Sequence, residues 1–185
     1  MISLSHDPRQ PLFTKAICQL SGNVYSMQRV TTYNVTIETL KKAAVEIIRM
    51  GDPAFFCCDV MQMFAKTPGL LDIHAIDYKS AFDVDVVYNM TKAERLDYGE
   101  STMTHAMALT GVHINESGKI ERWRVENSWG TSTGAAGFEV MTDEWFDTFV
   151  YQVVVEKKML KSLGLEGLLD ESVPVYEMPL WDALV

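Results

Sequence analysis

The chain has 185 residues, a hydrophobic fraction of 48% and a formal net charge of −9 at pH 7. This length suits one domain with an ordinary core, and the acidic balance argues against nucleic acid as a partner, because phosphate contacts need clustered Lys and Arg. No apolar run is long enough to cross a membrane, and the three cysteines form no disulfide framework, so we expect a cytoplasmic protein without membrane contact.

Three regions are expected along the chain. Residues 1–20 are expected to form an irregular N-terminal arm, because Pro8 and Pro11 interrupt regular structure. Residues 21–158 are expected to form the main folded unit, and residues 159–185 a C-terminal helix followed by an extended tail.

The main unit begins with a strand-like stretch at 23–35 and a helix. Thr36 is a suitable N-cap residue, and apolar side chains recur at helical spacing as far as about Met50. Gly51 then stands where a helix C-terminal cap belongs. The sequence therefore predicts one amphipathic helix over 36–50.

The next hundred residues are mostly short elements. We expect a buried strand at 54–60, a short helix at 61–66, a loop or short helix at 70–79, a strand at 81–88, a helical turn at 92–96, a small-residue loop at 132–137, a strand at 138–141, a helical turn capped by Thr142 and a closing strand at 151–156. One longer helix with several short, mostly hairpin-linked strands predicts an α+β fold with an antiparallel sheet.

The most informative stretch is a predicted hairpin. Residues 105–114 and 120–127 alternate as two strands, and turn-forming residues at 115–119 join them. Such a hairpin brings His105, at the start of one strand, close to Asn127, at the end of the other. An imidazole that serves a nucleophile needs a second group that fixes its tautomer, and the hairpin places such a group, the Asn127 amide, near His105.

The sequence motifs around these two residues resemble those of a known family. His105 within Thr-His-Ala and Asn127 within Glu-Asn-Ser-Trp-Gly resemble the histidine and asparagine half of a papain-like cysteine peptidase site. The stretches MTKAERLDYGESTMTHAM, WRVENSWG, MTDEWFDTFVYQVVVEKK and LWDALV are similar to the C-terminal part of the bleomycin hydrolase family of cysteine aminopeptidases. The resemblance implies a papain-like β-rich lobe, a twisted antiparallel half-barrel with flanking helices, without the lobe that carries the nucleophile.

The resemblance also implies roles. His105 would be the general base, Asn127 its orienter, and Trp129 a cover over the bond between them. The nucleophilic cysteine of this superfamily lies far upstream of the histidine, in a signature that does not occur here, and Cys57 and Cys58 lie in an apolar strand. We therefore expect a C-terminal portion that is inactive alone, that pairs with an N-terminal lobe of the same protein, and that acts with it on a peptide or aminoacyl amide.

The tail has two interpretations. In the family that the chain resembles, the C-terminal arm lies in the cleft, and its carboxylate meets the free amine of the substrate, which would make Val185 a clamp on the substrate end. Here the arm is short and ends in Val. A frayed terminus is the alternative.

A metal site and a second class of function are the alternatives to this interpretation. Neither His74 and His113 nor the cysteines show metal-ligand spacing, so we expect no metal and no cofactor. The resemblance implies a homohexamer. The alternative to a peptidase is a non-catalytic binding or assembly module derived from a truncated homologue.

Overall fold

The computed structural model describes residues 1–22, 24–25, 29–84 and 89–185. The strands are β1 Ile2–Ser5, β2 Lys15–Cys18, β3 Thr31–Asn34, β4 Ala54–Cys58, β5 Phe64–Ala65, β6 Leu70–Leu71, β7 His105–Ile114, β8 Ile120–Glu126, β9 Phe138–Thr142, β10 Val150–Val155 and β11 Val175–Met178. The helices are α1 Ile37–Arg49, α2 Tyr78–Phe82, α3 Lys92–Asp97, α4 Asp143–Phe149, α5 Leu160–Leu163 and the 3₁₀ turns η1 Lys157–Met159 and η2 Glu166–Leu169.

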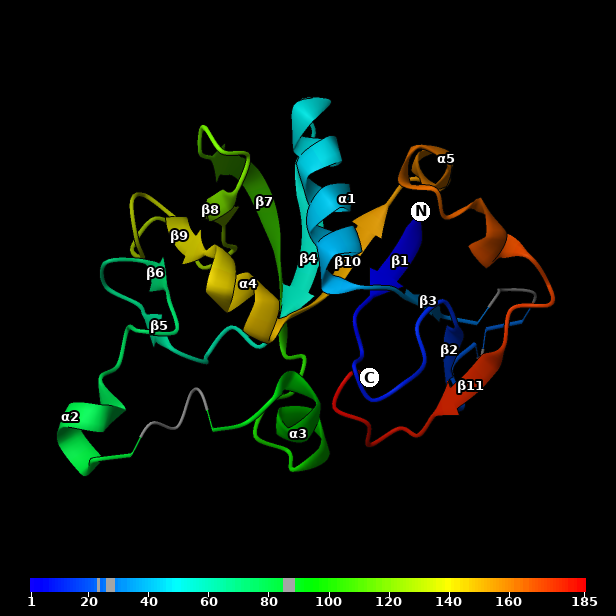
Figure 1. Ribbon diagram of the computed structural model, residues 1–185, viewed down its shortest axis with the longest axis horizontal. Helices are drawn as coiled ribbons and strands as arrows, with labels where there is room; N and C mark the ends of the chain where they lie inside the picture. The colour runs from blue at the N-terminus through cyan, green and yellow to red at the C-terminus, as the bar shows by residue number, and fades with distance from the viewer. Residues whose placement is uncertain (23, 26–28, 85–88) are drawn as a thin grey trace.

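All the described strands belong to one sheet, with the order β11-β2-β3-β1-β10-β4-β7-β8-β9-β6-β5 (Figure 1). The α+β class is as expected, and most strand pairs are antiparallel as expected. The sheet is nevertheless mixed, because β1 with β3, β11 with β2 and β6 with β9 pair in parallel. Parallel pairs need connections longer than a hairpin, and neither strand of such a pair follows the other directly in the chain.

The helix α1 forms as the sequence predicts. The side chain of Thr36 accepts a hydrogen bond from the amide of Thr39, and Gly51 follows the helix with a φ of 89°. Its buried face includes Leu40, Ala44 and Ile47. Figure 1 shows α1 lying across β4 and β10, where this face covers the middle of the sheet. No helix in the described residues is long and apolar enough to span a membrane.

A second apolar layer forms around α4. Thr142 accepts a hydrogen bond from the amide of Trp145 and so begins the helix, as predicted. The rings of Phe146 and Trp123 stack with centroids 5.0 Å apart, which joins α4 to β8. The indole N–H of Trp145 donates to the carbonyl of Gln62 at 2.7 Å. Because these rings are fully buried, the strands that carry the hairpin have a fixed support.

Several local predictions are wrong. Residues 1–20 are not an irregular arm, since β1 inserts between β3 and β10, and β2 pairs with β3 and β11. The short helix expected at 61–66 is a turn followed by β5, and residues 70–79 contain β6 and the start of α2. In each case tertiary pairing decided the conformation against weak local propensity.

Two strand predictions touch residues outside the described part. The strand expected at 81–88 falls partly on 85–88, which lie outside the described residues, and its first residues belong to α2. Of the strand expected at 23–35, only residues 31–34 form a strand, β3, and the described residues 24–25 and 29–30 are not strand. Residues 23 and 26–28 of that prediction lie outside the described residues.

The C-terminal segment is ordered along the sheet. The helical spacing at 159–171 yields α5 and η2, and the αL residue Gly164 ends α5 with a φ of 72°. The tail is extended, as expected, but it is not frayed, because β11 pairs with β2 and Leu184 is buried.

Candidate active site

The segment that leads into the hairpin is held by one buried carboxylate. Asp59 follows β4, and its Oδ2 accepts hydrogen bonds from the Ser101 hydroxyl at 3.0 Å and the Thr102 amide at 3.1 Å. The Ser101 hydroxyl also lies 2.6 Å from the hydroxyl of Tyr151. The amide of Thr104 donates to the carbonyl of Cys58 at 3.0 Å. These contacts fix the chain just before His105.

The predicted pair meets. His105 begins β7 and Asn127 follows the last residue of β8, and the His105 Nε2 lies 3.0 Å from the Asn127 Oδ1. Since an amide oxygen only accepts, the ring carries its proton on Nε2 and leaves Nδ1 as the basic nitrogen. Within the described residues, Nδ1 makes no hydrogen bond. In this arrangement, Nδ1 of His105 can accept a proton from an acidic group that approaches it.

An indole lies beside the histidine. The ring of Trp129 is next to that of His105, with centroids 4.9 Å apart and planes at 33°. Trp129 also contacts Phe64, with ring centroids 6.1 Å apart, and the ammonium of Lys66 lies 5.2 Å from the centre of its ring.

A residue that sequence reasoning missed completes the cluster. Glu139 of β9 accepts a hydrogen bond from the Asn127 Nδ2 at 3.1 Å through Oε1, and its side chain is 1% exposed. Burial raises the pKa of Glu139, while the Asn127 hydrogen bond and the charges of His105 and Lys66 oppose that rise. The sequence feature that could have identified Glu139 is its position in β9, because the period of two places it on the same face as the buried Met141.

No thiol among the described residues is activated. Cys58 is the cross-strand partner of His105, but it is fully buried, and burial raises its pKa. Burial also raises the pKa of Cys57 to about 11. Thiols in this state are protonated at neutral pH and are poor nucleophiles. Cys18, half-buried in β2, donates to the carbonyl of Gln19.

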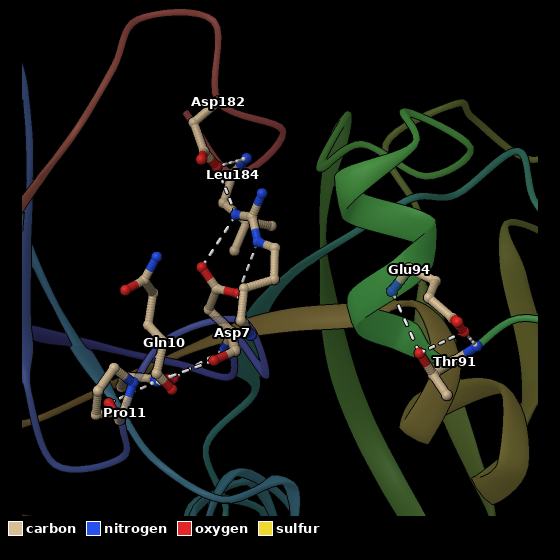
Figure 2. A network of polar contacts seen from close by, with 9 residues as sticks. Asp7, Gln10, Pro11, Thr91, Glu94, Asp182 and Leu184 are labelled. Atoms are coloured by element: carbon tan, nitrogen blue, oxygen red, sulfur yellow. Dashed lines mark hydrogen bonds and ion pairs between the residues drawn. The ribbon is translucent and has the colours of Figure 1, made fainter.

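The end of the chain lies near this site. The Ala183 carbonyl accepts a hydrogen bond from the amide of Met103 at 2.8 Å. Asp182 accepts from the guanidinium of Arg9 at 2.8 Å and from the amide of Leu184 at 2.9 Å. Figure 2 shows Asp182 and Asp7 facing each other, and both carboxylates bind Arg9. These contacts anchor the tail next to the strand that carries His105.

The other two histidines for which a metal site was considered lie apart from each other's side chains and pair with glutamates. His74 lies 3.3 Å from Glu144, and His113 lies 3.4 Å from Glu121, both on exposed surfaces. In the described part of the chain, no three His, Cys, Asp or Glu side chains gather closely enough to hold a metal ion.

Comparisons with known proteins agree with these features. The Peptidase C1-like family is matched over residues 1–185. The chain is 40% identical to "Aminopeptidase C" of Lactococcus lactis subsp. cremoris over 163 residues, which are 88% of this chain and 36% of that protein. It is 39% identical to "Bleomycin hydrolase" of Homo sapiens over 187 residues, which cover 99% of this chain and 40% of that protein.

One solved structure gives the same result in three dimensions. The crystal structure of PepW from Lactobacillus rhamnosis HN001 superposes with a TM-score of 0.89 at 38% identity, covering 99% of this chain and 41% of that one. The resemblance seen in the sequence and the fold class are therefore confirmed. The chain spans about two fifths of the length of the relatives it matches.

Proposed function

The chain belongs to the Peptidase C1-like family, and from that premise we propose that it supplies the general base of a cysteine aminopeptidase. The observation that carries the proposal is the 3.0 Å contact between the His105 Nε2 and the Asn127 Oδ1, with Nδ1 left basic. In this proposal the substrate is a peptide or an aminoacyl amide, and Trp129 covers the pair.

The proposed reaction uses a thiol that lies outside these 185 residues. Nδ1 of His105 takes the proton of the thiol, and the thiolate attacks the carbonyl carbon of the scissile amide. The imidazolium then returns the proton to the leaving amine, so that a thioester forms. Water, deprotonated by the same imidazole, hydrolyses the thioester and regenerates the thiol. Asn127 keeps the ring in one tautomer through both steps.

The raised pKa values of Cys57 and Cys58 support the view that the nucleophile is not in this chain. We propose that a further lobe of the same protein carries it, and that the 185 residues alone are inactive. The complete enzyme is the protein that contains both this chain and that cysteine. Its location in the cytoplasm and its assembly into a homohexamer belong to the same proposal.

In this proposal, the tail determines which end of the substrate the enzyme binds. We propose that the carboxylate of Val185 pairs with the free α-ammonium of the substrate, so that only N-terminal residues are removed. The anchoring of Ala183 beside Met103 supports this, because it leads the chain end toward the strand of His105. The terminal residue itself is 46% exposed, so its carboxylate is accessible to a partner.

The test separates the two halves of the proposal. In the complete enzyme, His105→Ala should abolish hydrolysis of an aminoacyl-coumarin amide, whereas His113→Ala, an exposed histidine on the same strand, should not. The 185-residue chain alone should neither hydrolyse this reporter nor bind a thiol-directed epoxide covalently. Stoichiometric labelling of Cys57 or Cys58 together with turnover would overturn the proposal, and full activity of His105→Ala would do the same.

The alternative, a non-catalytic binding or assembly module, predicts a different result when the complete protein is assayed for turnover. Such a module would give no turnover in any context, with or without the rest of its protein. The aligned His105, Asn127 and Trp129 are the observation that favours the peptidase.

A further inference from the structure

The hydrogen-bond chain does not stop at Asn127. A carboxamide has one accepting end and one donating end, and either can face the histidine unless something selects between them. Among the described residues, the only hydrogen bond of the Asn127 side chain besides that to His105 is the one from Nδ2 to Glu139 at 3.1 Å. An ionised carboxylate accepts and never donates, so it selects the NH₂ end.

The selection has a consequence for the imidazole. If the amide of Asn127 turned over, its oxygen would face the oxygen of Glu139, and its NH₂ would face the ring of His105. The hydrogen bond to Glu139 would then require a protonated carboxyl group, and the hydrogen bond to His105 would require the other histidine tautomer. Through Asn127, Glu139 therefore fixes which ring nitrogen of His105 stays basic.

The position of Glu139 is costly for a side chain that serves packing alone. It is 1% exposed, and its Oε2 has no hydrogen-bond partner within the described residues. A buried, half-satisfied carboxyl group destabilises a fold relative to an apolar side chain of similar size.

The backbone above Glu139 closes tightly. A Cβ on Gly69 would lie 2.5 Å from the Cα of Gly134 and 3.3 Å from the Cγ of Glu139. Gly69 also has a φ of 69°, so two glycines allow this loop contact over the carboxyl group. Water is thereby kept from competing with the Asn127 hydrogen bond.

We propose that Glu139 is a positioning residue of the site: it holds Asn127 with the oxygen toward His105 and places a negative charge behind the imidazolium that forms during the reaction. This rests on the proposed function of His105. The charged or titratable groups that interact with Glu139 are His105 on β7, Lys66 after β5 and Cys58 on β4. Of these groups Lys66 is the cation, and the carboxylate would stabilise the imidazolium that forms at His105 during the proposed reaction.

The test compares three variants of the complete enzyme. Glu139→Gln keeps an acceptor but loses the charge and adds a donor that permits the turned amide. Glu139→Leu removes both. Glu126→Gln is the matched control, because it removes an exposed carboxylate from the neighbouring strand. Each is assayed for kcat, KM and the pH profile of kcat/KM.

We expect kcat to fall about threefold in Glu139→Gln and about tenfold in Glu139→Leu, with KM changed less than about twofold, because a charge-assisted contact acts on the proton-transfer step. In both variants the acid limb of the profile should move to lower pH, because the imidazolium loses its nearby negative charge and the imidazole then becomes neutral at a lower pH. The control should keep the profile of the unmodified enzyme. Unchanged kcat and unchanged limbs in both variants would overturn the proposal, even if their melting temperatures differ.

A second readout covers the case in which Glu139→Leu fails to fold. In the complete enzyme labelled with ¹⁵N-histidine, the ring shifts of His105 should report the Nε2–H tautomer, and Glu139→Gln should add the other tautomer. An unaltered tautomer would also overturn the proposal. Failure of the proposed function is distinguishable, because it would appear as turnover in His105→Ala, whatever the Glu139 variants do.

Discussion

The carbonyl of Ala183 accepts a hydrogen bond from the amide of Met103 at 2.8 Å, so residues 80 positions apart meet two residues before His105. The contact joins the last turn of the chain to the segment that Asp59 holds from the other side. A backbone hydrogen bond therefore joins the end of the chain to the segment that precedes His105.

The first prediction concerns the carboxylate at the chain end. Adding two glycines after Val185 of the complete enzyme moves the charge but leaves Leu184 buried, so cleavage should lose its preference for a free α-amine while stability is unchanged. The measurement compares hydrolysis of a peptide reporter with and without N-terminal acetylation. Deleting Leu184 and Val185 should also cost stability, by about 2 kcal/mol for the lost leucine burial. A persistent free-amine preference in the extended variant would refute the clamp.

The second prediction concerns the orienting amide. Asn127→Ala in the complete enzyme removes the 3.0 Å contact with His105 and frees both tautomers, so kcat should fall by about ten- to a hundredfold at nearly constant KM. Steady-state assays at several pH values measure this. Asn115→Ala, in the exposed hairpin turn, is the control for the loss of an asparagine. Equal kcat in the two variants would contradict the assigned role.

The third prediction uses a lysine outside the site. The ammonium of Lys92 points inward, donates to the carbonyls of Asp147 and Val150, and lies 4.7 Å from the centre of the Tyr151 ring. Burial lowers the pKa of Lys92 to about 7. The unfolded chain keeps an ordinary lysine pKa near 10, so between about pH 7 and 10 the unfolded state binds more protons than the folded state.

Stability should therefore rise with pH across that window, by up to about 1.4 kcal/mol per pH unit from this group. Urea unfolding at pH 7, 8, 9 and 10 measures the slope, and Lys92→Met should remove this contribution. Lys42→Met, an exposed lysine of α1, should keep the slope of the unmodified protein. Parallel curves for all three proteins would show that Lys92 is charged in the fold throughout.

The fourth prediction tests the support of the segment before His105. Asp59→Asn replaces an acceptor of the Ser101 hydroxyl and Thr102 amide with a side chain that also needs acceptors, so unfolding free energy should fall by about 1–3 kcal/mol. Asp52→Asn, at an exposed position, is the control. Urea midpoints measure the loss. Equal midpoints for the two variants would show that Asp59 contributes little.

Local signals carried the prediction of particular elements. The Thr36 cap and the Thr142 cap both begin helices, and the alternation on each side of the turn at 115–119 produces β7 and β8. The same hairpin brought His105 and Asn127 into one site, because a hairpin fixes which residues lie opposite. Predictions based on a helix cap or on a hairpin were therefore correct, whereas the short helix expected at 61–66 from weak local propensity was wrong.

Long-range pairings were not predictable in this way. Nothing near Ile2 in the sequence indicates that β1 will lie between β3 and β10, or that β11 will join β2. Glu139 was missed for a different reason: its carboxyl group is of the type that belongs on the surface, and only the register of β9 against β8 turns it inward. Where a polar residue breaks the expected pattern, function is the more informative explanation.

The sheet order also constrains how the protein is made. Among the described strands, β10 alone connects the half-sheet β11-β2-β3-β1 with the half-sheet that begins at β4 and carries the histidine. During translation, β1 and β4 emerge from the ribosome before β10 does. Until residues 150–155 emerge, the two sheet edges that β10 will join are unpaired, and unpaired strand edges are sites of aggregation.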